Sequence, residues 1–311
     1  ARAYTGRDKV LFCGYHGWHD WYLAANLNND NLSEHLFNGI EPLGVPKALL
    51  GTVAPFPYGS LECLSKLLEE NVDQVACIIM EPMRSEEPPG GYLQGVRDLA
   101  NKHNVILIFD EVSSGFRIAL GGVQEYTGIT PDISTFPKAL SNGYALGAIV
   151  GQRDYMDVAE KLFISSAYWD DTIGVVAGLA TLRELQIRKA VSHFKEVGSY
   201  FRSSINEAAA VANIDASCRG TSSFPKIHFD IKDPILLKKI ETLFIQENAR
   251  QGLLLSGGIF LNLSHNHEIV DRTAEAVANS FKIISLALER DNIDKVLDVP
   301  LQNDLFRRLV N

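Results

Sequence analysis

Two residues of reactive type stand in a stretch whose pattern otherwise indicates buried structure. Asp110 ends the apolar run 105–109, and Lys138 follows the short β-like run 133–136. A continuous apolar run bounded by polar residues is typical of a strand buried on both faces of a parallel sheet. Open α/β sheets bind ligands at the carboxyl ends of their strands, so Asp110 lies where a functional group is expected. A lysine at the end of a buried strand is rare unless its amine is paired or covalently engaged, so we expect Lys138 to be buried and engaged.

A carboxylate and an amine at the ends of two buried strands suit the chemistry of pyridoxal 5′-phosphate (PLP). The lysine amine forms a Schiff base with the cofactor aldehyde. The carboxylate keeps the pyridine nitrogen protonated, and the protonated ring accepts electrons from the substrate. The alternative is that Asp110 caps a helix and Lys138 is a solvated loop residue. Taken by themselves, these two residues leave both interpretations open.

The residues around Asp110 and Lys138 resemble class III PLP-dependent aminotransferases, whose fold is called fold type I. The resemblance is carried by 109–117 (FDEVSSGFR) and 132–144 (DISTFPKALSNGY). It implies that Asp110 contacts the pyridine nitrogen, that Val112 packs under the ring and that Lys138 carries the Schiff base. Many relatives have Gln where Ser113 stands, and Ser113 is predicted to lie at the cofactor. This difference favours the branch of glutamate-1-semialdehyde aminomutase.

The same resemblance assigns further cofactor-binding residues at the ends of two other predicted strands. Tyr15 and His16 follow the strand-like run 9–14, and the resemblance implies that the aromatic ring of Tyr15 stacks on the pyridine. Glu81 follows the run 75–80 and is expected to face the site. The alternative for Tyr15 is a surface loop with simple aromatic packing. The alternative for Glu81 is a solvated strand end. His16 and His19 have no second ligand cluster beside them, so no metal site is predicted.

Phosphate binding is where the chain departs from the family pattern. Relatives place a threonine where Ala167 stands, and Ser166 and Thr172 are the neighbours predicted to replace it. Relatives also carry a Gly-Ser-rich turn whose amides bind the phosphate, as helix N-termini do. The segment 1–7 resembles the last turns of a helix, with Gly6 as the residue that stops it. In relatives, the Gly-Ser-rich turn stands at the start of that helix. The sequence is therefore expected to lack the family's N-terminal segment, which leaves open whether this chain binds PLP.

Composition limits the classes of partner. The 311 residues are 46% hydrophobic and 22% charged, as in a globular chain with a sizeable core, and the net charge is −9. This charge argues against nucleic acid and against an anionic membrane surface as partners. No apolar run approaches transmembrane length. Four cysteines without metal-like spacing are expected to be free thiols in a reducing cytoplasm.

Strand-like and helix-like patterns alternate through the first part of the chain, which predicts an α/β fold. We expect a mainly parallel sheet with helices on both faces over residues 1–186 and a smaller α+β domain over 187–311. The segment 51–58 contains two prolines and is expected at a sheet edge. In the second domain we predict a strand at 257–264, and Arg219 is a candidate ligand for a substrate carboxylate, although a lone arginine is more often a surface residue.

Two functions from different classes remain open on the sequence. The first is a PLP-dependent aminotransferase or aminomutase that moves an amino group to or within a small carbonyl substrate through Lys138. It would take a small-molecule amino donor and carbonyl acceptor and, as the family does, act as a homodimer. The second is a non-catalytic homologue that serves as a binding or assembly subunit.

Overall fold

The computed structural model describes residues 1–33, 35, 39–83, 85–165 and 169–302. By internal contacts the chain divides into two compact units, Ala1–Arg188 and Lys189–Asn311. Each unit has its own sheet or hairpin and its own helices, and each is described below by itself.

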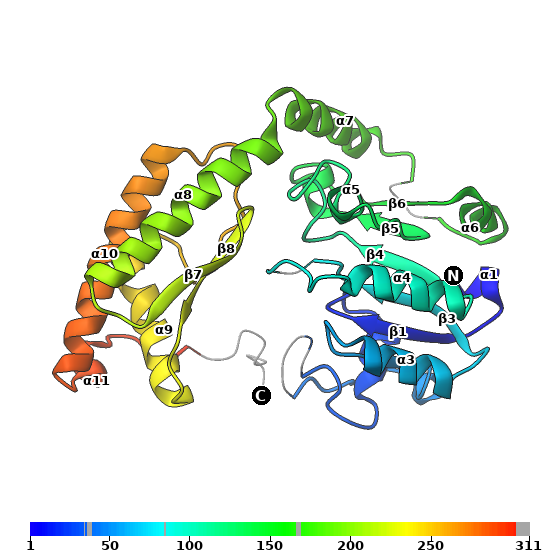
Figure 1. Cartoon of the computed structure of the whole chain (residues 1–311), viewed down its shortest axis with the longest axis horizontal. Coiled ribbons are helices and arrows are strands. Elements are labelled where there is room, and N and C mark those ends of the chain that lie inside the picture. Colours follow the sequence, from blue (N-terminus) through cyan, green and yellow to red (C-terminus); the bar gives the residue numbers. More distant parts are fainter. Residues whose placement is uncertain (34, 36–38, 84, 166–168, 303–311) are drawn as a thin grey trace. The chain divides into compact units, whose positions relative to one another are not determined.

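The first unit is built on a six-stranded sheet with the strand order β2-β1-β3-β4-β5-β6 (Figure 1). Its strands are β1 (Lys9–Cys13), β2 (Val53–Pro55), β3 (Val75–Met80), β4 (Ile106–Asp110), β5 (Ile133–Phe136) and β6 (Ala148–Gly151). The first five are parallel to one another, and β6 pairs antiparallel with β5. The predicted mainly parallel sheet is therefore confirmed, with the Pro-containing β2 at one edge.

Apolar side chains on both faces of this sheet explain why its strands are continuous hydrophobic runs. Leu11 and Cys13 of β1 belong to a buried cluster with α3 (Leu61–Glu70) and α4 (Tyr92–Lys102). The alternate residue Phe12 faces the other side, because successive side chains of a strand point to opposite faces. Both faces of the sheet are thus closed to water over its central strands β1, β3 and β4.

The face that carries Phe12 is covered mainly by a short helix and an irregular segment. Tyr22 of α2 (Asp20–Leu23), the turn Ala24–Asn26, and the buried Leu32 and Val45 pack there. The segment 24–48 is rich in polar residues. The described part of this segment nevertheless contributes to the core of the first unit.

The remaining helices of the first unit are short, apart from α7. They are α1 (Arg2–Thr5), α5 (Val123–Thr127), α6 (Arg153–Met156) and α7 (Thr172–Ile187), with single 3₁₀ turns at Lys47–Leu49, Lys138–Leu140 and Asp157–Lys161. α1 ends at Gly6 in the left-handed region with φ of 66°. The predicted helix stop at Gly6 is confirmed.

The second unit packs a β-hairpin against long helices. Its elements are α8 (Ala190–Val211), β7 (Ala216–Thr221), β8 (Phe224–Phe229), α9 (Pro234–Arg250), α10 (His267–Glu289) and α11 (Ile293–Val296). α8 and α10 run side by side (Figure 1). Phe229, Phe244 and Phe281 meet at ring-centroid distances of 5.4 to 6.0 Å and anchor the core of this unit.

The predicted strand at 257–264 is wrong. This segment forms no regular strand: it makes one isolated bridge, between Gly258 and Lys226 of β8, and three backbone hydrogen bonds with residues 223–227. Gly257 has φ of 111°, which is outside strand geometry. Phe260 stacks on Phe224 at 4.1 Å. The segment thus pairs with residues 223–227 over part of its length without forming a regular strand.

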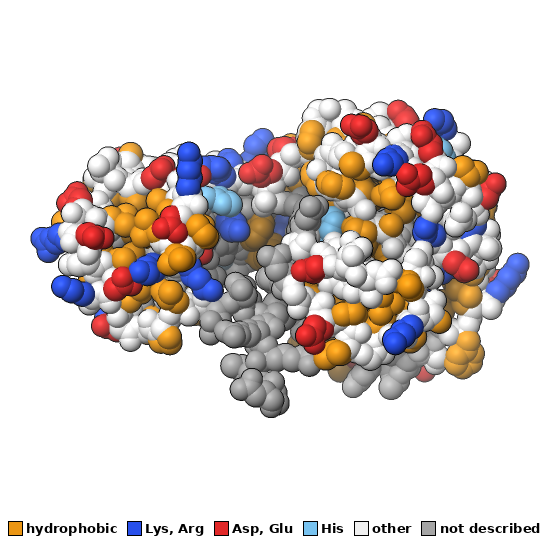
Figure 2. Space-filling view, turned by 90° about the horizontal axis from the view of Figure 1, so that it is seen from below, with side chains coloured by type: hydrophobic (Ala, Val, Ile, Leu, Met, Phe, Trp, Pro, Cys, Tyr) orange, Lys and Arg blue, Asp and Glu red, His pale blue; other side chains and the backbone are white. Residues whose placement is uncertain are grey.

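Charges of both signs are interspersed on the face of the molecule that Figure 2 shows, without a large area of one sign. Among the described residues, no helix combines the length and the apolar character that crossing a membrane would require. The cysteines Cys13, Cys77 and Cys218 are buried free thiols, and Cys63 is an exposed one.

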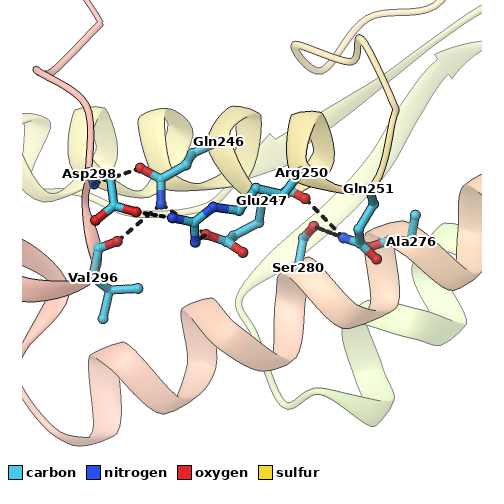
Figure 3. Close-up of polar contacts among 8 residues, drawn as sticks. All are labelled: Gln246, Glu247, Arg250, Gln251, Ala276, Ser280, Val296 and Asp298. Carbon is cyan, nitrogen blue, oxygen red and sulfur yellow. Dashed lines mark hydrogen bonds and ion pairs between the residues drawn. The ribbon is translucent and has the colours of Figure 1, made fainter.

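A run of polar residues on α9 joins three parts of the second unit (Figure 3). The side chain of Gln246 donates to the carbonyl of Val296 at 3.0 Å and accepts from the backbone N–H of Asp298 at 2.8 Å. Gln251, the C-cap of α9, donates to the carbonyl of Ala276 and to Ser280 of α10. α9 and its C-cap therefore hold α10, the end of α11 and the segment after α11 by hydrogen bonds.

Candidate active site

Five of the predicted site residues follow the carboxyl ends of parallel strands at one edge of the sheet. Tyr15 and His16 come after β1, Glu81 after β3 and Asp110 at the end of β4. Lys138 comes two residues after the end of β5, and β5 pairs with β4 through Asp110 and Thr135. These side chains therefore share one edge of the sheet, which is the edge at which α/β proteins bind ligands.

Asp110 and His16 form a buried pair. His16 Nδ1 lies 2.7 Å from Asp110 Oδ2, and His16 Nε2 lies 3.2 Å from the carbonyl oxygen of Cys13. The exposed fractions are 5% for Asp110 and 7% for His16. Since both ring nitrogens face acceptor oxygens, His16 is engaged as the partner of Asp110. The sequence had assigned His16 to the cofactor directly and did not anticipate this pairing.

The second oxygen of Asp110 is also held. Asp110 Oδ1 accepts from the backbone N–H of Val112 at 3.1 Å and from Thr135 Oγ1 at 3.3 Å. Contacts to both oxygens fix the orientation of the carboxylate, because rotation would break one set of hydrogen bonds. Asp110 is thus a preorganised buried anion at the strand end, and the helix-cap interpretation of this residue does not apply.

Glu81 organises the turn that presents Tyr15. The backbone N–H of Glu81 donates to the carbonyl of Cys13 at 3.0 Å, and Glu81 Oε2 accepts from the N–H of Tyr15 at 3.1 Å. Gly14 has φ of 114°, and a Cβ there would lie 2.6 Å from Glu81 Oε2. Glu81 is buried, so the alternative of a solvated strand end is wrong. The contact also shows why the residue before Tyr15 is glycine.

The ring of Tyr15 is half-buried among other aromatic side chains. It lies 5.5 Å from Trp18 and 5.9 Å from Tyr22, measured between ring centroids. Desolvation raises the pKa of Tyr15 above its ordinary value, and a side-chain hydrogen bond with Trp18 opposes this. Tyr15 therefore offers a flat ring of restricted orientation at the site.

Lys138 begins a single 3₁₀ turn, and its side chain is exposed in this chain. Our expectation that it would be buried is therefore wrong. The reason is local, because β5 ends at Phe136 and the backbone of Lys138 then adopts the left-handed region with φ of 52°. Val112 and Ser113, which come directly after β4 and its flanking Glu111, are half-buried.

The other residues predicted to bind cofactor or substrate make no contact with the sheet-edge residues above in the described part of the chain. Thr172 is exposed and begins α7, whose N-cap is Asp171. Ser166 and Ala167 lie outside the described residues. Arg219 of β7 is paired with Asp230 across the base of the hairpin, and this pairing lowers the pKa of Asp230. Because the guanidinium already has a carboxylate partner, we withdraw Arg219 as a candidate substrate ligand.

Glu111 is a buried residue at the site that the sequence reasoning missed. Its carboxylate accepts from Ser114 Oγ and from the N–H of Val123, the latter at 2.6 Å. A signal was present, because Glu111 directly follows Asp110 and successive side chains of an extended chain point to opposite sides. Asp110 facing the site therefore turns Glu111 towards the interior.

The side chains present fit a pyridine cofactor that bears an aldehyde. The buried Asp110 carboxylate suits a protonated ring nitrogen, Tyr15 suits the ring face, and Lys138 has a primary amine that can bind an aldehyde. These three groups lie at or after the ends of β4, β1 and β5, and they suit the ring and the aldehyde of PLP.

Comparisons with known proteins agree with this assignment. A family model described as aminotransferase class-III matches residues 2–287. The chain is 34% identical over 289 residues to the 3-aminobutyryl-CoA aminotransferase of Cloacimonas acidaminovorans, covering 90% of this chain and 66% of that protein. It is 32% identical over 308 residues to the glutamate-1-semialdehyde 2,1-aminomutase of Methanocaldococcus jannaschii, covering 91% and 70%.

A solved structure of a transaminase with PLP bound has the same fold. It superposes with a TM-score of 0.80 at 24% sequence identity, over 92% of this chain and 69% of that one. The chain therefore spans roughly two thirds of the length of these relatives, 66–70% by the values above. The family match implies PLP as the cofactor. On its sequence match and its fold, this chain belongs to the class-III aminotransferase family.

Proposed function

We propose that the chain is the catalytic part of a PLP-dependent aminotransferase or aminomutase that moves an amino group to or within a small carbonyl compound. The observation that carries this proposal is the parallel pairing of β4 with β5, which sets Asp110 and Lys138 after neighbouring strands at one sheet edge. Its partners would be a small-molecule amino donor and a carbonyl acceptor.

The residues would divide the work as follows. Bound PLP supplies an aldehyde that reacts with amines and a ring that accepts electrons from the substrate carbon. Lys138 would hold the cofactor covalently and, once free, would take a proton from the substrate carbon on Nζ and return it. Asp110, held by His16, would stabilise positive charge on the ring nitrogen. Tyr15 and Val112 would enclose the ring from its two faces.

The residues that would bind the phosphate and the substrate are less well defined than those that would bind the ring and the aldehyde. We propose Ser113, Ser166 and Thr172 as cofactor contacts on the resemblance alone. The relatives include both an aminotransferase and an aminomutase, so the transfer of an amino group is shared while the substrate differs. Turnover of a single substrate without a separate acceptor would indicate a mutase, and a requirement for a keto acceptor would indicate an aminotransferase.

We also propose a homodimer in a reducing cytoplasmic compartment. Free cysteines, three of them buried, support the compartment. Exposed apolar side chains on β6, on α7 and in the segment before α7 support an interface on the first unit.

The covalent role of Lys138 is tested by trapping. PLP is added, the protein is reduced with sodium borohydride, and the peptide that carries the added mass is identified. We expect the mass on the peptide with Lys138, and its loss in Lys138→Ala, because an alanine has no amine to bind the aldehyde. The matched control is Lys161→Ala, which removes another exposed lysine of the first unit and should leave the label in place.

Two results would count against this function. Label that persists at an unchanged level in Lys138→Ala would refute the assignment of this lysine. A wild-type protein that stays colourless with PLP and takes up no label would favour the non-catalytic binding or assembly subunit.

A further inference from the structure

We propose that Glu111 is a positioning residue whose buried carboxylate closes the loop between β4 and α5 and thereby places Val112 and Ser113 at the cofactor. This inference rests on the proposed function, since it assigns a role in holding PLP. No residue of this loop other than Val112 and Ser113 was expected to matter for the site.

The carboxylate of Glu111 ties the start of the loop to its end. Glu111 Oε1 accepts from the N–H of Val123 at 2.6 Å and from the N–H of Gln124 at 3.4 Å. These are the first two residues of α5, where backbone N–H groups have no partner within the helix. Glu111 Oε2 accepts from Ser114 Oγ. One side chain therefore joins residues three, twelve and thirteen positions further along the chain.

The surroundings of Glu111 are shaped to this carboxylate. Its exposed fraction is 1%. Gly122 has φ of 77°, and a Cβ there would lie 2.5 Å from Glu111 Oε1. Gly115 packs on the other end of the residue, where a Cβ would lie 2.8 Å from the Glu111 carbonyl oxygen. Both glycines leave room that a side chain would fill, so the loop is built around Glu111.

The closed loop is joined to the proposed cofactor groups at its first residues. The N–H of Glu111 donates to the carbonyl of Thr135 at 3.0 Å, which extends the pairing of β4 with β5. The N–H of Val112 donates to Asp110 Oδ1 at 3.1 Å, and the carbonyl of Ser113 accepts from the guanidinium of Arg117 at 3.0 Å. A shift of the loop would therefore move Val112 and Ser113 and disturb a hydrogen bond of Asp110.

The hydrogen bonds of the Glu111 carboxylate allow a conservative replacement by glutamine. Burial raises the pKa of Glu111 above its ordinary value, and the hydrogen bonds from Ser114, Val123 and Gln124 oppose that effect. A glutamine has the same shape, and its carbonyl oxygen can still accept from the N–H of Val123. Its amide can donate to Ser114 Oγ, because a hydroxyl rotates to act as acceptor. Alanine retains none of these bonds.

The experiment compares Glu111→Ala and Glu111→Gln with two controls. Glu125→Ala removes an exposed carboxylate of the same region, which accepts from the N–H of Gly121 at 2.5 Å. Val96→Ala destabilises the buried core beneath α4, a cluster that also includes Val123, but it removes none of the hydrogen bonds of Glu111. For each variant, hydrogen exchange of the peptide covering 111–124 is measured without cofactor, and the PLP dissociation constant is measured by absorbance.

We expect Glu111→Ala to weaken PLP binding by about tenfold or more and to speed exchange in 111–124, because buried N–H groups lose a charged acceptor. Glu111→Gln should stay within about threefold of the wild type, because it keeps the hydrogen bond to Val123. Val96→Ala should lower the melting temperature and leave the PLP dissociation constant unchanged. Glu125→Ala should leave the PLP dissociation constant unchanged. Within 111–124 it should affect exchange only at Gly121, whose N–H loses its acceptor.

Either of two results would overturn the inference. The first is unchanged exchange of 111–124 in Glu111→Ala. The second is an equal loss of PLP affinity in Val96→Ala and Glu111→Ala, which would mean that Glu111 only stabilises the fold. A wild-type protein that takes up no PLP would contradict the proposed function instead, and the exchange measurement would then decide by itself whether Glu111 positions the loop.

Discussion

At the scale of single residues, the site is defined by how the Asp110 carboxylate is held. His16, Val112 and Thr135 contact its two oxygens, and the side chain is almost fully buried. A buried carboxylate without partners would be very costly, so these contacts are a condition for having the acid at this place. The same contacts keep it in one orientation before any ligand arrives, as preorganised electrostatic sites require.

The pairing of His16 with Asp110 makes a quantitative prediction. His16→Phe should lower the free energy of unfolding by about 1–3 kcal/mol, because it strands a buried acceptor. Asp110→Asn in the same background should recover part of that loss, since a neutral amide is less costly to bury. A double-mutant cycle by urea unfolding measures the coupling, which we expect to be about 0.5–3 kcal/mol.

Asp215→Asn is the control for the removal of a carboxylate in that cycle. It changes an exposed aspartate of the second unit, whereas His16 belongs to the first. Combined with His16→Phe, it should give additive effects. Additive effects for His16 and Asp110 would contradict an energetically important contact between them.

At the scale of elements, α9 shows how a helix can be specified by polar contacts. Asp233 caps its N-terminus by accepting from the N–H of Ile235 and of Leu236, and Pro234 takes the first turn, where a missing N–H is tolerated. Its buried polar residues then bind different neighbours: Asn248 accepts from Ser280 of α10, and Gln246 binds the last residue of α11 and the segment after it. The family match ends at residue 287, so this last segment lies beyond it.

The contact between Gln246 and the backbone of 296–298 should dominate the attachment of that segment. Gln246→Ala leaves the carbonyl of Val296 and the N–H of Asp298 without their side-chain partner. We expect a loss of about 1–3 kcal/mol in unfolding free energy, because the amide is buried. Hydrogen exchange of the peptide covering 296–302 should also become faster.

A second variant on the same helix tests whether the effect of Gln246 depends on the burial of its hydrogen bonds. Lys239 of α9 pairs with Asp294 at 2.7 Å, and Asp294 is largely exposed. Solvent screens such pairs, so Lys239→Ala should cost no more than about 1 kcal/mol. Equal effects of the two substitutions on exchange in 296–302 would show that the buried amide has no special role.

At the scale of the whole molecule, the first unit leaves several large apolar side chains exposed to solvent. Ile149 of β6 is 64% exposed, Phe163 is 99% exposed and Val176 of α7 is 63% exposed. α7 still belongs to this unit, because Gly178 packs so closely that a Cβ would lie 2.9 Å from Leu146. Exposed apolar side chains of this size mark surfaces that other protein surfaces cover.

The proposed homodimer is testable on α7. Val176→Glu should raise the dimer dissociation constant by about tenfold or more, because a charge would be buried without a partner. Sedimentation velocity over a range of protein concentrations measures this. Val211→Glu, at an exposed valine that ends α8 in the second unit, should leave the constant unchanged. A wild-type protein that sediments as a monomer at all concentrations would contradict the homodimer.

Much of the first unit could be predicted because strand patterning is a local property. Runs such as 75–80 and 105–109 are apolar throughout, which requires burial on both faces and hence a parallel sheet covered on both sides. The positions of the acids at the ends of these runs, and of the lysine after 133–136, followed from chain order alone, and the roles proposed for them rest on the resemblance to the family. The same local signals, namely glycine after a helix and proline in an edge strand, predicted the end of α1 and the place of β2.

The pairings inside the site depended on the order of the strands in the sheet. His16 follows β1 and Asp110 ends β4, and these strands are separated by β3 in the sheet and by about ninety residues in the chain. Local periodicity carries no information about such a contact, because any of several strand orders satisfies the same apolar pattern. The engagement of Arg219 by Asp230 and the closing of a loop by Glu111 were decided in the same way. Each depends on which groups the folded backbone brings within hydrogen-bonding distance, and only the tertiary structure determines that.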